Sequence, residues 1–352
     1  MSAEWVIALD AMGGDNAPAM VIRGAAAVAE RHPQVRYLLF GDRARLEPLL
    51  RQHAALTTLT EIRHTTETIS SDEKPGVALR KGRGSSMRLA IDAVAAGEAS
   101  AVVSAGNTGA LMALAKFVLR TLPGIDRPAI ASFFPSETGE CVLLDLGANI
   151  ECDANNLVQF AVMGANFAHS VLGRSRPTVG LLNVGTEDVK GNDAVRGAAD
   201  ILRRHSKLAF DFHGFVEGDD IAHGTVDVVV TDGFTGNVAL KTAEGTARLV
   251  SGFLRAAFRS SIMAKLGYLL ARSALVALRD RIDPRFYNGG VFLGLNGIVV
   301  KSQGGSDAVA FANALTLAVD MARDNLTRRI AVEFERFSAE VAAAAVAPLE
   351  AS

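Results

Sequence analysis

The first candidates for chemistry are short polar turns that contain glycine. Residues 5–18 read WVIALDAMGGDNAP: an apolar run stops at Asp10, passes Gly13-Gly14 and reaches Pro18, where a helix can start. A strand, a glycine turn and a helix start bring backbone N–H groups towards an anion in α/β proteins. The turn matches neither the dinucleotide fingerprint nor a Walker loop, and on its own it fits an ordinary tight turn equally well.

Four further polar turns follow strand-like runs. They are SAGNTGA (104–110), LDLGANIECD (144–153), LNVGTEDVKGN (182–192) and TDGFTGNVALK (231–241). One such turn is ordinary loop chemistry, but five with Asn, Asp or Thr beside glycine favour a shared site. Because the carboxyl ends of strands in an open parallel sheet line one crevice, we expect all five turns to face a single binding site.

Amides, hydroxyls, carboxylates and a few cations make up these turns and their surroundings. Such a set suits an oxyanion substrate, with backbone N–H groups and lysine supplying positive potential. The candidate cations are Lys74, Arg80, Lys81, Lys190 and Lys241. Any one of them fits a solvated surface charge as well, but Lys190 is preferred because it lies in VGTEDVKGN between two glycines.

Several familiar motifs are absent or incomplete. GNVALKT (236–242) lacks a Walker glycine, and GRGSSM (82–87) lacks the third glycine of the dinucleotide fingerprint. No GxSxG or HExxH occurs, and the histidines show no metal-ligand spacing, so we expect no metal site. Cys141 lies in a strand run and is expected in the core, while Cys152 fits a structural thiol better than a nucleophile.

Composition bounds the class of protein. The 352 residues are 49% hydrophobic, which is ample for a large core. The net charge of -2 gives no global field for nucleic acid, so no nucleic-acid partner is expected. Two cysteines outside a CxxC pair indicate a reducing compartment. The N-terminus does not resemble a signal peptide, and no run of about 18 apolar residues predicts a membrane span.

Short β-branched runs alternate with longer helical patterns. This alternation predicts an α/β fold with a mostly parallel sheet covered on both faces. The expected strands are 5–9, 37–40, 101–104, 130–134, 141–144, 178–182 and 226–230. The expected helices are 18–30, 85–96, 107–119, 155–171, 193–204 and 307–323.

One segment is not explained by a site. Residues 248–281 combine apolar residues at helical spacing with seven basic residues and a single acid, Asp280. They predict a projecting helical hairpin at about 246–281. A buried dimer interface with a solvated basic face and a surface for acidic carrier protein or anionic lipid fit the pattern equally. We expect one α/β domain with two lobes over 1–338 and an Ala-rich tail over 339–352.

Taken together, the turns strongly resemble those of the PlsX phosphate acyltransferases of bacterial phospholipid synthesis. The matching motifs, between about Val6 and Arg323, are ALDAMGGDNAP, SAGNTGA, LDLGAN, NVGTEDVKGN, DGFTGN and GLNGIVVKSQGGSDA. Each motif alone is modestly specific, whereas six in this order are very specific.

The resemblance implies transfer of a fatty acyl group from acyl carrier protein to inorganic phosphate. The product is the acyl phosphate that a membrane glycerol-phosphate acyltransferase consumes. The resemblance further implies a Rossmann-like three-layer sandwich related to phosphotransacetylases and to isocitrate and isopropylmalate dehydrogenases. It also implies a homodimer, a cytoplasmic enzyme that touches the membrane, and no metal or nucleotide cofactor.

Phosphate can attack a thioester directly, so no serine or cysteine nucleophile is needed and none is evident. The expected catalytic residues are Lys190, for phosphate or the developing oxyanion, with Asn237 and Asp232. The expected substrate-binding residues are Asp10, Gly13, Gly14, Asp15, Asn16, Lys81, Ser104, Asn107, Thr108, Asn149, Asn183, Gly185 and Thr186. The three aspartates orient hydrogen-bond donors rather than act as bases, because a bare carboxylate repels phosphate.

Two other functions remain open at this point. One is a phosphotransacetylase that uses acyl-coenzyme A, against which the long apolar and basic segment argues. The other is a non-catalytic phosphate- or nucleotide-binding regulator that docks on membranes. Phosphate-dependent release of thiol from acyl carrier protein separates all three.

Overall fold

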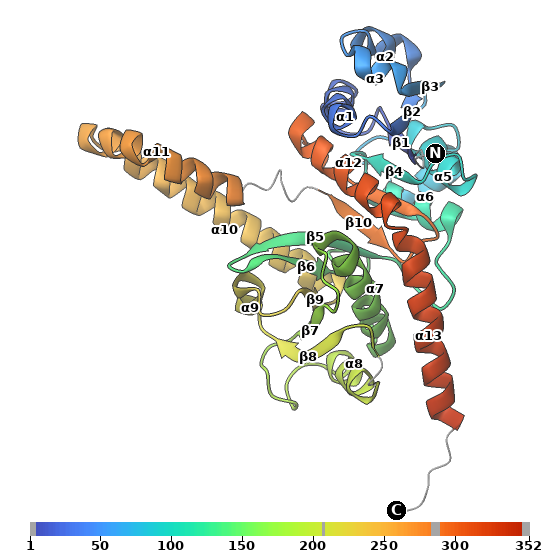
Figure 1. Ribbon diagram of the computed structural model, residues 1–352, viewed down its shortest axis with the longest axis vertical. Coiled ribbons are helices and arrows are strands. Elements are labelled where there is room, and N and C mark those ends of the chain that lie inside the picture. Colours follow the sequence, from blue (N-terminus) through green and yellow to red (C-terminus); the bar gives the residue numbers. More distant parts are fainter. Residues whose placement is uncertain (1–4, 206–207, 283–288, 347–352) are drawn as a thin grey trace, which may run out of the picture.

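In the part of the chain that the structure describes, eleven strands form one sheet at the centre of the protein (Figure 1). The computed structural model describes residues 5–205, 208–282 and 289–346. The strand order is β3-β2-β1-β4-β11-β10-β5-β6-β9-β7-β8. The strands are β1 (Trp5–Asp10), β2 (Val35–Gly41), β3 (Thr60–His64), β4 (Ala101–Ser104), β5 (Ala129–Ser136), β6 (Gly139–Leu144), β7 (Thr178–Leu182), β8 (Asp211–Val216), β9 (Val228–Val230), β10 (Gly290–Leu293) and β11 (Ile298–Lys301).

Helices cover both faces of this sheet. Since side chains alternate along a strand, Ile7 and Leu9 of β1 join the core beneath α1, α7 and α12, while Ala8 joins the core beneath α5 and α6. The helices are α1 (Ala19–Arg31), α2 (Arg43–Leu50), α3 (Ala54–Thr58), α4 (Pro75–Lys81), α5 (Ser86–Ala95), α6 (Thr108–Leu119), α7 (Ala154–Leu172), α8 (Asp193–Arg204), α9 (Gly218–His223), α10 (Gly233–Arg259), α11 (Ile262–Ile282), α12 (Ala308–Arg323) and α13 (Leu326–Val346).

The predicted α/β fold with a mostly parallel sheet is confirmed, and each expected strand and helix is present within a few residues. Local signals explain this agreement. Side chains cap the helix starts: Asn107 accepts from the Ala110 N–H at 3.0 Å, Asn192 from the Val195 N–H at 2.9 Å, and Asp307 from the Ala310 N–H at 2.9 Å.

The two halves of the sheet run in opposite directions. Strands β1, β2, β3, β4 and β11 are parallel to one another, as are β6, β7, β8 and β9. Between the halves lie three antiparallel pairings, β11 with β10, β10 with β5, and β5 with β6. An odd number of antiparallel pairings reverses the strand direction, so the two halves end at opposite edges.

Helices α10 and α11 pack against each other and extend away from the sheet (Figure 1). The ring centroids of Phe258 and Tyr268 lie 5.5 Å apart between them. Helix α10 begins at Gly233, well before the expected start at about 246. The side chains of Arg279 and Arg281 lie outside the described residues. In the predicted tail, α13 continues to Val346, and residues 347–352 lie outside the described ranges.

Candidate active site

The predicted turns lie at two opposite edges of the sheet. Strands β1, β4 and β11 end at one edge, called here the first edge, and β6, β7 and β9 end at the other, the second edge. The expectation that all five turns face one crevice is therefore wrong. That expectation assumed parallel strands throughout, whereas β10 and β5 pair antiparallel with their neighbours in the middle of the sheet.

Asp10 organises the first edge. Its side chain is buried at the end of β1 and accepts hydrogen bonds from the hydroxyls of Ser86 at 2.6 Å and Ser104 at 2.7 Å. Ser104, at the end of β4, also accepts from the N–H of Gly106 at 3.0 Å. Burial raises the pKa of the Asp10 carboxyl, and the two serine hydrogen bonds oppose that rise. The network fixes the turn after β1 to the turn after β4.

The Gly13-Gly14 turn comes close to both neighbouring loops. A Cβ on Gly13 would lie 2.8 Å from the backbone nitrogen of Gly106. Gly14 has φ 102°, and a Cβ there would lie 2.9 Å from the Ala105 Cβ and 3.2 Å from the Gly304 carbonyl oxygen. The turn after β4 and the loop after β11 are therefore its close neighbours.

The first edge also contains a topological switch point. Strand β1 lies between β2 and β4, so the chain leaves β1 towards one side of the sheet and later returns on the other. Ligands of open α/β sheets bind in the crevice outside such a point, at the carboxyl ends of the strands. Asp10 and Ser104 lie on the two strands that flank it.

Lys301 is a functional candidate that the sequence reasoning missed. It ends β11, and its ammonium group donates to the carbonyl oxygens of Ala105, at 3.5 Å, and Ser302. Burial lowers the pKa of Lys301 to about 8, although the nearby charges of Asp10 and Asp15 oppose this change. The available signal was a lysine that ends the apolar run Ile298–Val300 and precedes Ser-Gln-Gly-Gly.

The other expected residues of the first edge have definite places. Asn16 donates to the Ser306 carbonyl at 3.0 Å. The Asn107 amide donates to three carbonyls of the loop before α4, including that of Glu73 at 2.8 Å, so it holds this loop in place. Thr108 is exposed at the start of α6, and Lys81 is exposed in the last turn of α4, which packs on α6.

The second edge is organised by a different aspartate, Asp145, which follows β6. Its fully buried carboxylate accepts from the backbone N–H groups of Ile130, Gly147, Ala148 and Asn149, at 2.7–3.3 Å. The Asn149 side chain adds a fifth hydrogen bond at 2.9 Å and also donates to the Pro128 carbonyl. Burial raises the pKa of Asp145, opposed by these donors.

The segment TDGFTGNVALK is mostly helix rather than a turn. Asp232 caps α10 by accepting from the N–H and hydroxyl of Thr235, each at 2.8 Å. A Cβ on Gly233 would lie 2.6 Å from the Asn149 carbonyl oxygen, so only glycine lets the helix start so close to the Asp145 turn. Asn237 lies in the second turn of the helix and donates to the Leu146 carbonyl at 3.0 Å.

The loop after β7 completes the second edge. Asn183 donates to the carbonyl oxygens of Gly185, at 3.0 Å, and Lys190, at 3.3 Å, which closes the loop on itself. Gly185 is buried beneath the Lys190 side chain, whereas Thr186 and Lys190 are exposed. The structure therefore brings Asn149, Asn183, Asp232 and Asn237 to neighbouring strand ends and places Lys190 on the rim, across the sheet from Asp10.

Apolar side chains are exposed around the second edge. Val184 and Val189 lie in the same loop as Lys190 and are 78% and 80% exposed. Phe234 of α10 is 61% exposed, and the exposed apolar surface continues along the hairpin to Leu270, at 87%. Monomeric soluble proteins rarely leave so much apolar surface uncovered, so this surface suits a partner.

Thiol and metal chemistry find little support in the described residues. Cys141 is buried in β6, as expected, and burial raises the pKa values of Cys141 and Cys152 to about 12. No cluster of three or more histidine, cysteine, aspartate or glutamate residues that could hold a metal ion occurs in the described ranges. No described helix is long and apolar enough to cross a membrane.

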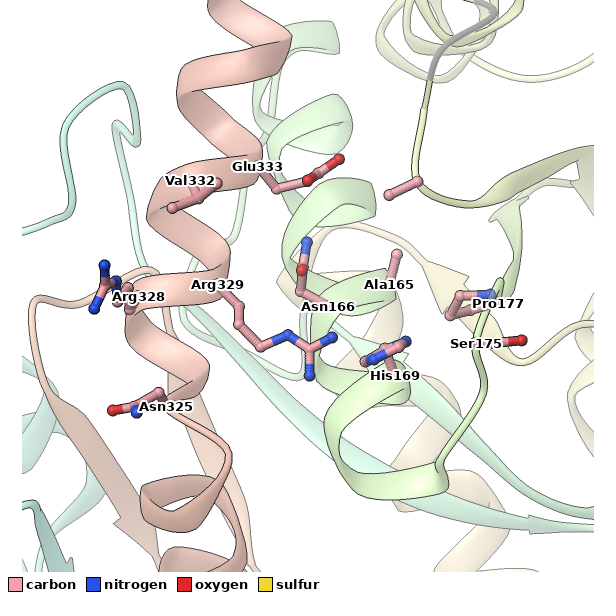
Figure 2. A pocket seen from close by; sticks show the side chains of 11 residues that line it. Ala165, Asn166, His169, Ser175, Pro177, Asn325, Arg328, Arg329, Val332 and Glu333 are labelled. Carbon is pink, nitrogen blue, oxygen red and sulfur yellow. The ribbon is translucent and has the colours of Figure 1, made fainter.

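A cavity of about 350 Å³ lies between α7, α13 and the loop before β7 (Figure 2). Figure 2 shows Arg329 of α13 pointing towards His169 and Asn166 of α7. Pro177 and Ala209, just before the amino ends of β7 and β8, also line the cavity. Ligands of open sheets bind at carboxyl ends, so this cavity is not our candidate active site.

Comparisons with known proteins agree with this architecture. A phosphotransacetylase from Streptococcus pyogenes matches with a TM-score of 0.63 and 20% identity, covering 92% of this chain and 95% of its own. A putative 4-hydroxythreonine-4-phosphate dehydrogenase from Salmonella typhimurium matches with a TM-score of 0.54 and 12% identity, covering 91% and 100%. At these identities the likeness shows the fold alone, an α/β fold with a mostly parallel sheet.

Sequence relatives are much closer. The phosphate acyltransferase of Rhodospirillum centenum is 62% identical over 348 residues, 99% of this chain and 98% of the relative. That of Paramagnetospirillum magneticum is 59% identical over 336 residues, 96% and 95%. Residues 5–329 match the family described as "Fatty acid synthesis protein". The chain belongs to this family, and it is an acyltransferase.

Proposed function

We propose that this protein transfers a fatty acyl group from acyl carrier protein to inorganic phosphate and so supplies acyl phosphate for phospholipid synthesis. The observation that carries the proposal is the 62% identity to a phosphate acyltransferase over nearly the whole of both chains. No protein nucleophile is assigned: a phosphate oxygen attacks the thioester carbonyl carbon, and the thiolate of the carrier leaves.

The proposed substrate site is the first edge. Glycine at positions 13 and 14 leaves room for backbone N–H groups to face phosphate, and Asp10 and Ser104 hold the surrounding loops. Holding phosphate in line with the carbonyl supplies much of the rate increase, since orientation alone contributes several kcal/mol. Asp15, Asn16, Lys81, Asn107 and Thr108 are the other proposed contributors from this edge.

We assign stabilisation of the oxyanion to Lys190, with Asn237 and Asp232 holding its surroundings and Asn149, Asn183, Gly185 and Thr186 shaping the same edge. Within one chain these residues lie across the sheet from Asp10. A homodimer resolves this separation if the partner's Lys190 reaches the first edge of its neighbour. The exposure of Lys190, Val184 and Val189 supports such a contact.

A mixing experiment tests the shared site. Lys190→Ala and Gly14→Val should each be inactive alone. In an equal, co-refolded mixture, half of the dimers are mixed and each contains one intact site, so about a quarter of the wild-type activity should return. An inactive mixture in which mixed dimers are present would place both residues within one chain, and a Lys190→Ala variant with near-normal turnover would remove Lys190 from the mechanism.

The hairpin is the proposed docking element. Its exposed apolar residues and the exposed basic residues Arg248, Arg255, Arg259, Lys265 and Arg272 suit an anionic lipid surface or acidic carrier protein. We propose a cytoplasmic enzyme that attaches peripherally to the membrane, beside the glycerol-phosphate acyltransferase that consumes its product. Attachment at the membrane fits an amphiphilic, labile product.

The finer fold assignment is also a proposal. We propose a Rossmann-like three-layer sandwich of the isocitrate and isopropylmalate dehydrogenase type, and treat residues 1–338 as one unit. Helices on both faces of one sheet support this assignment. No cofactor or metal has a part in the proposed reaction.

A second candidate is acyl transfer from coenzyme A, favoured by the likeness in fold to phosphotransacetylases. One assay separates it from the first proposal and from a non-catalytic phosphate-binding regulator. Free thiol is measured with long-chain acyl carrier protein or short-chain acyl-coenzyme A, each with and without phosphate. We expect phosphate-dependent release from the carrier protein. Release from coenzyme A alone would favour the second candidate, and no release with either donor would favour the regulator.

A further inference from the structure

Lys301 occupies an unusual position for a lysine. Lys301 is half-buried at the end of β11, and a lysine is almost never fully buried without a partner of opposite charge. Within the described ranges Lys301 forms no ion pair of 4 Å or less, and its ammonium donates to two carbonyl oxygens, of Ala105 and Ser302. An ammonium has three donors, so one N–H bond remains for a ligand.

The charges around Lys301 favour a proton donor over a phosphate-binding cation. Asp10 at the end of β1 and Asp15 in the following turn are the charged groups that act on it. Strands β4 and β10, beside β11, contain no ionisable side chain. On the covering helices, Lys116 is exposed near the far end of α6, and Asp307 caps α12 by accepting from Ala310. The two carboxylates offset the charge of this ammonium, so binding of phosphate is left to the backbone N–H groups of the Gly13-Gly14 turn, while the ammonium can still transfer a proton to sulfur.

The proposed reaction can use such a donor. When a phosphate oxygen bonds to the carbonyl carbon, the C–S bond breaks and its electron pair goes to the sulfur of the carrier's prosthetic group. A thiol of this kind has a pKa near 8.5, so its thiolate can leave unaided, but it leaves faster when a proton reaches the sulfur as the C–S bond breaks. An acid whose pKa lies close to that value transfers the proton most effectively.

We propose that Lys301 is the acid that protonates the leaving sulfur of the carrier thioester. This inference rests on the proposed acyl transfer to phosphate. In the step, one Nζ–H proton moves to sulfur, which leaves as the thiol, and Lys301 is left as a neutral amine. The proton that hydrogen phosphate loses on becoming an acyl phosphate restores the ammonium through solvent, so charge and protons balance.

The position of Lys301 predicts a pH dependence. Its protonated form is the active one, and its pKa is about 8, so kcat/KM should fall as the pH rises through about 8. Lys301→Arg keeps the positive charge but cannot release a proton in this range. We expect Lys301→Arg and Lys301→Met to lose about 100-fold or more in kcat and to lack this alkaline decline.

A change of leaving group gives the decisive test. In a thioester of the same acyl chain with nitrothiophenol, the leaving sulfur needs no proton, because nitrothiophenol is a much stronger acid than an alkyl thiol. With this substrate we expect Lys301→Met to recover to within about tenfold of the wild type, and the wild type to lose its alkaline decline. The matched control Lys116→Met, at an exposed lysine of α6, should behave as the wild type with both substrates.

Two outcomes would overturn the inference. A Lys301→Arg variant with near-normal turnover of acyl carrier protein would show that only the charge matters. Equal losses of a folded Lys301→Met variant with both thioesters would show a structural role. If these variants do not fold, the wild-type pH profiles still decide, since an alkaline decline that persists with nitrothiophenol excludes leaving-group protonation. Failure of the proposed function looks different, because the wild type itself would then release no thiol in response to phosphate.

Discussion

The turn after β1 and the turn after β6 start from similar sequences, LDAMGG and LDLGAN, but their buried aspartates meet different partners. Asp145 accepts five hydrogen bonds from amide groups, which hold residues 145–149 against the strand edge. Asp10 accepts from two serine hydroxyls and, at 3.3 Å, from the backbone N–H of Met12 in its own turn, and it lies near the ammonium of Lys301. Two similar sequences therefore form different structures: a fixed backbone turn around Asp145, and a polar site with a nearby cation around Asp10.

The difference lies in what can respond to a ligand. Amide donors within the turn around Asp145 cannot turn away without unfolding it, so this carboxylate is committed to structure. Hydroxyls rotate, and a lysine with one free N–H bond can change partners, so the Asp10 surroundings can adjust to a substrate. The second edge contributes instead an exposed apolar rim and the hairpin.

The largest expected effect concerns the first edge. Gly14→Val should reduce activity by about 1,000-fold or more, because the new side chain meets Ala105 and Gly304 and φ 102° disfavours it. Turnover and thermal unfolding are measured together. Gly139→Val is the matched control: its φ is 137° with no atom within 4 Å, and its activity should survive. Normal turnover of Gly14→Val would separate this turn from the site.

The next prediction compares how much Asp145 and Asp10 each contribute to the free energy of unfolding. Asp145→Ala leaves four backbone N–H groups without their acceptor, and we expect the free energy of unfolding to fall by about 3 kcal/mol or more. Asp10→Ala should cost about 1–2 kcal/mol, since the two serine hydroxyls can rotate towards other acceptors, but it should impair turnover. Urea unfolding of both variants checks the order, and a reversed order would break the contrast.

The hairpin variant tests what the second edge contributes beyond the site. Leu266, Leu269 and Leu270 are 51%, 63% and 87% exposed, and their replacement by Glu should reduce cosedimentation with anionic liposomes by about tenfold or more. The control carries Glu at the exposed positions Ser273, Ala274 and Ala277, which adds equal charge to the same helix. Unchanged liposome binding would exclude these leucines as the membrane contact, and loss of the dimer would assign them to an interface.

A smaller effect links Asp10 to Lys301. The charge of Asp10 raises the pKa of Lys301, so Asp10→Asn should lower that pKa below about 8. The alkaline decline of kcat/KM should then begin at lower pH, by about one unit. The exposed Asp219 supplies a control, because Asp219→Asn should leave the profile in place. If the alkaline decline of kcat/KM occurs at the same pH in Asp10→Asn as in the wild type, a group other than Lys301 causes that decline.

The smallest expected effect is on the thiols. A Cys141→Ala, Cys152→Ala double variant should keep its phosphate-dependent activity within about twofold, because pKa values near 12 leave almost no thiolate at neutral pH. Mass spectrometry of the enzyme during turnover provides the complementary measurement. An acylated peptide containing either cysteine would refute direct attack by phosphate.

Local patterns predicted most helices and strands, because capping residues and apolar periodicity act within a few residues of each other. The reversal of the sheet depends on β10 and β5, which are separated by about 150 residues and pair only in the folded chain. The same long-range pairing hid the division of the site into two edges. Lys301 was missed because β11 is only four residues long, and a lysine after so short a run looks like a surface charge.

Helix α10 starts at the Asp232 cap and continues for 27 residues to the tip of the hairpin. At a rise of 1.5 Å per residue, the helix is about 40 Å long. Because the helix is continuous, the distance between its first residue, Gly233, and its last, Arg259, is fixed. A contact made at the tip therefore lies about 40 Å from the Asp232 cap and from the strand ends of the second edge.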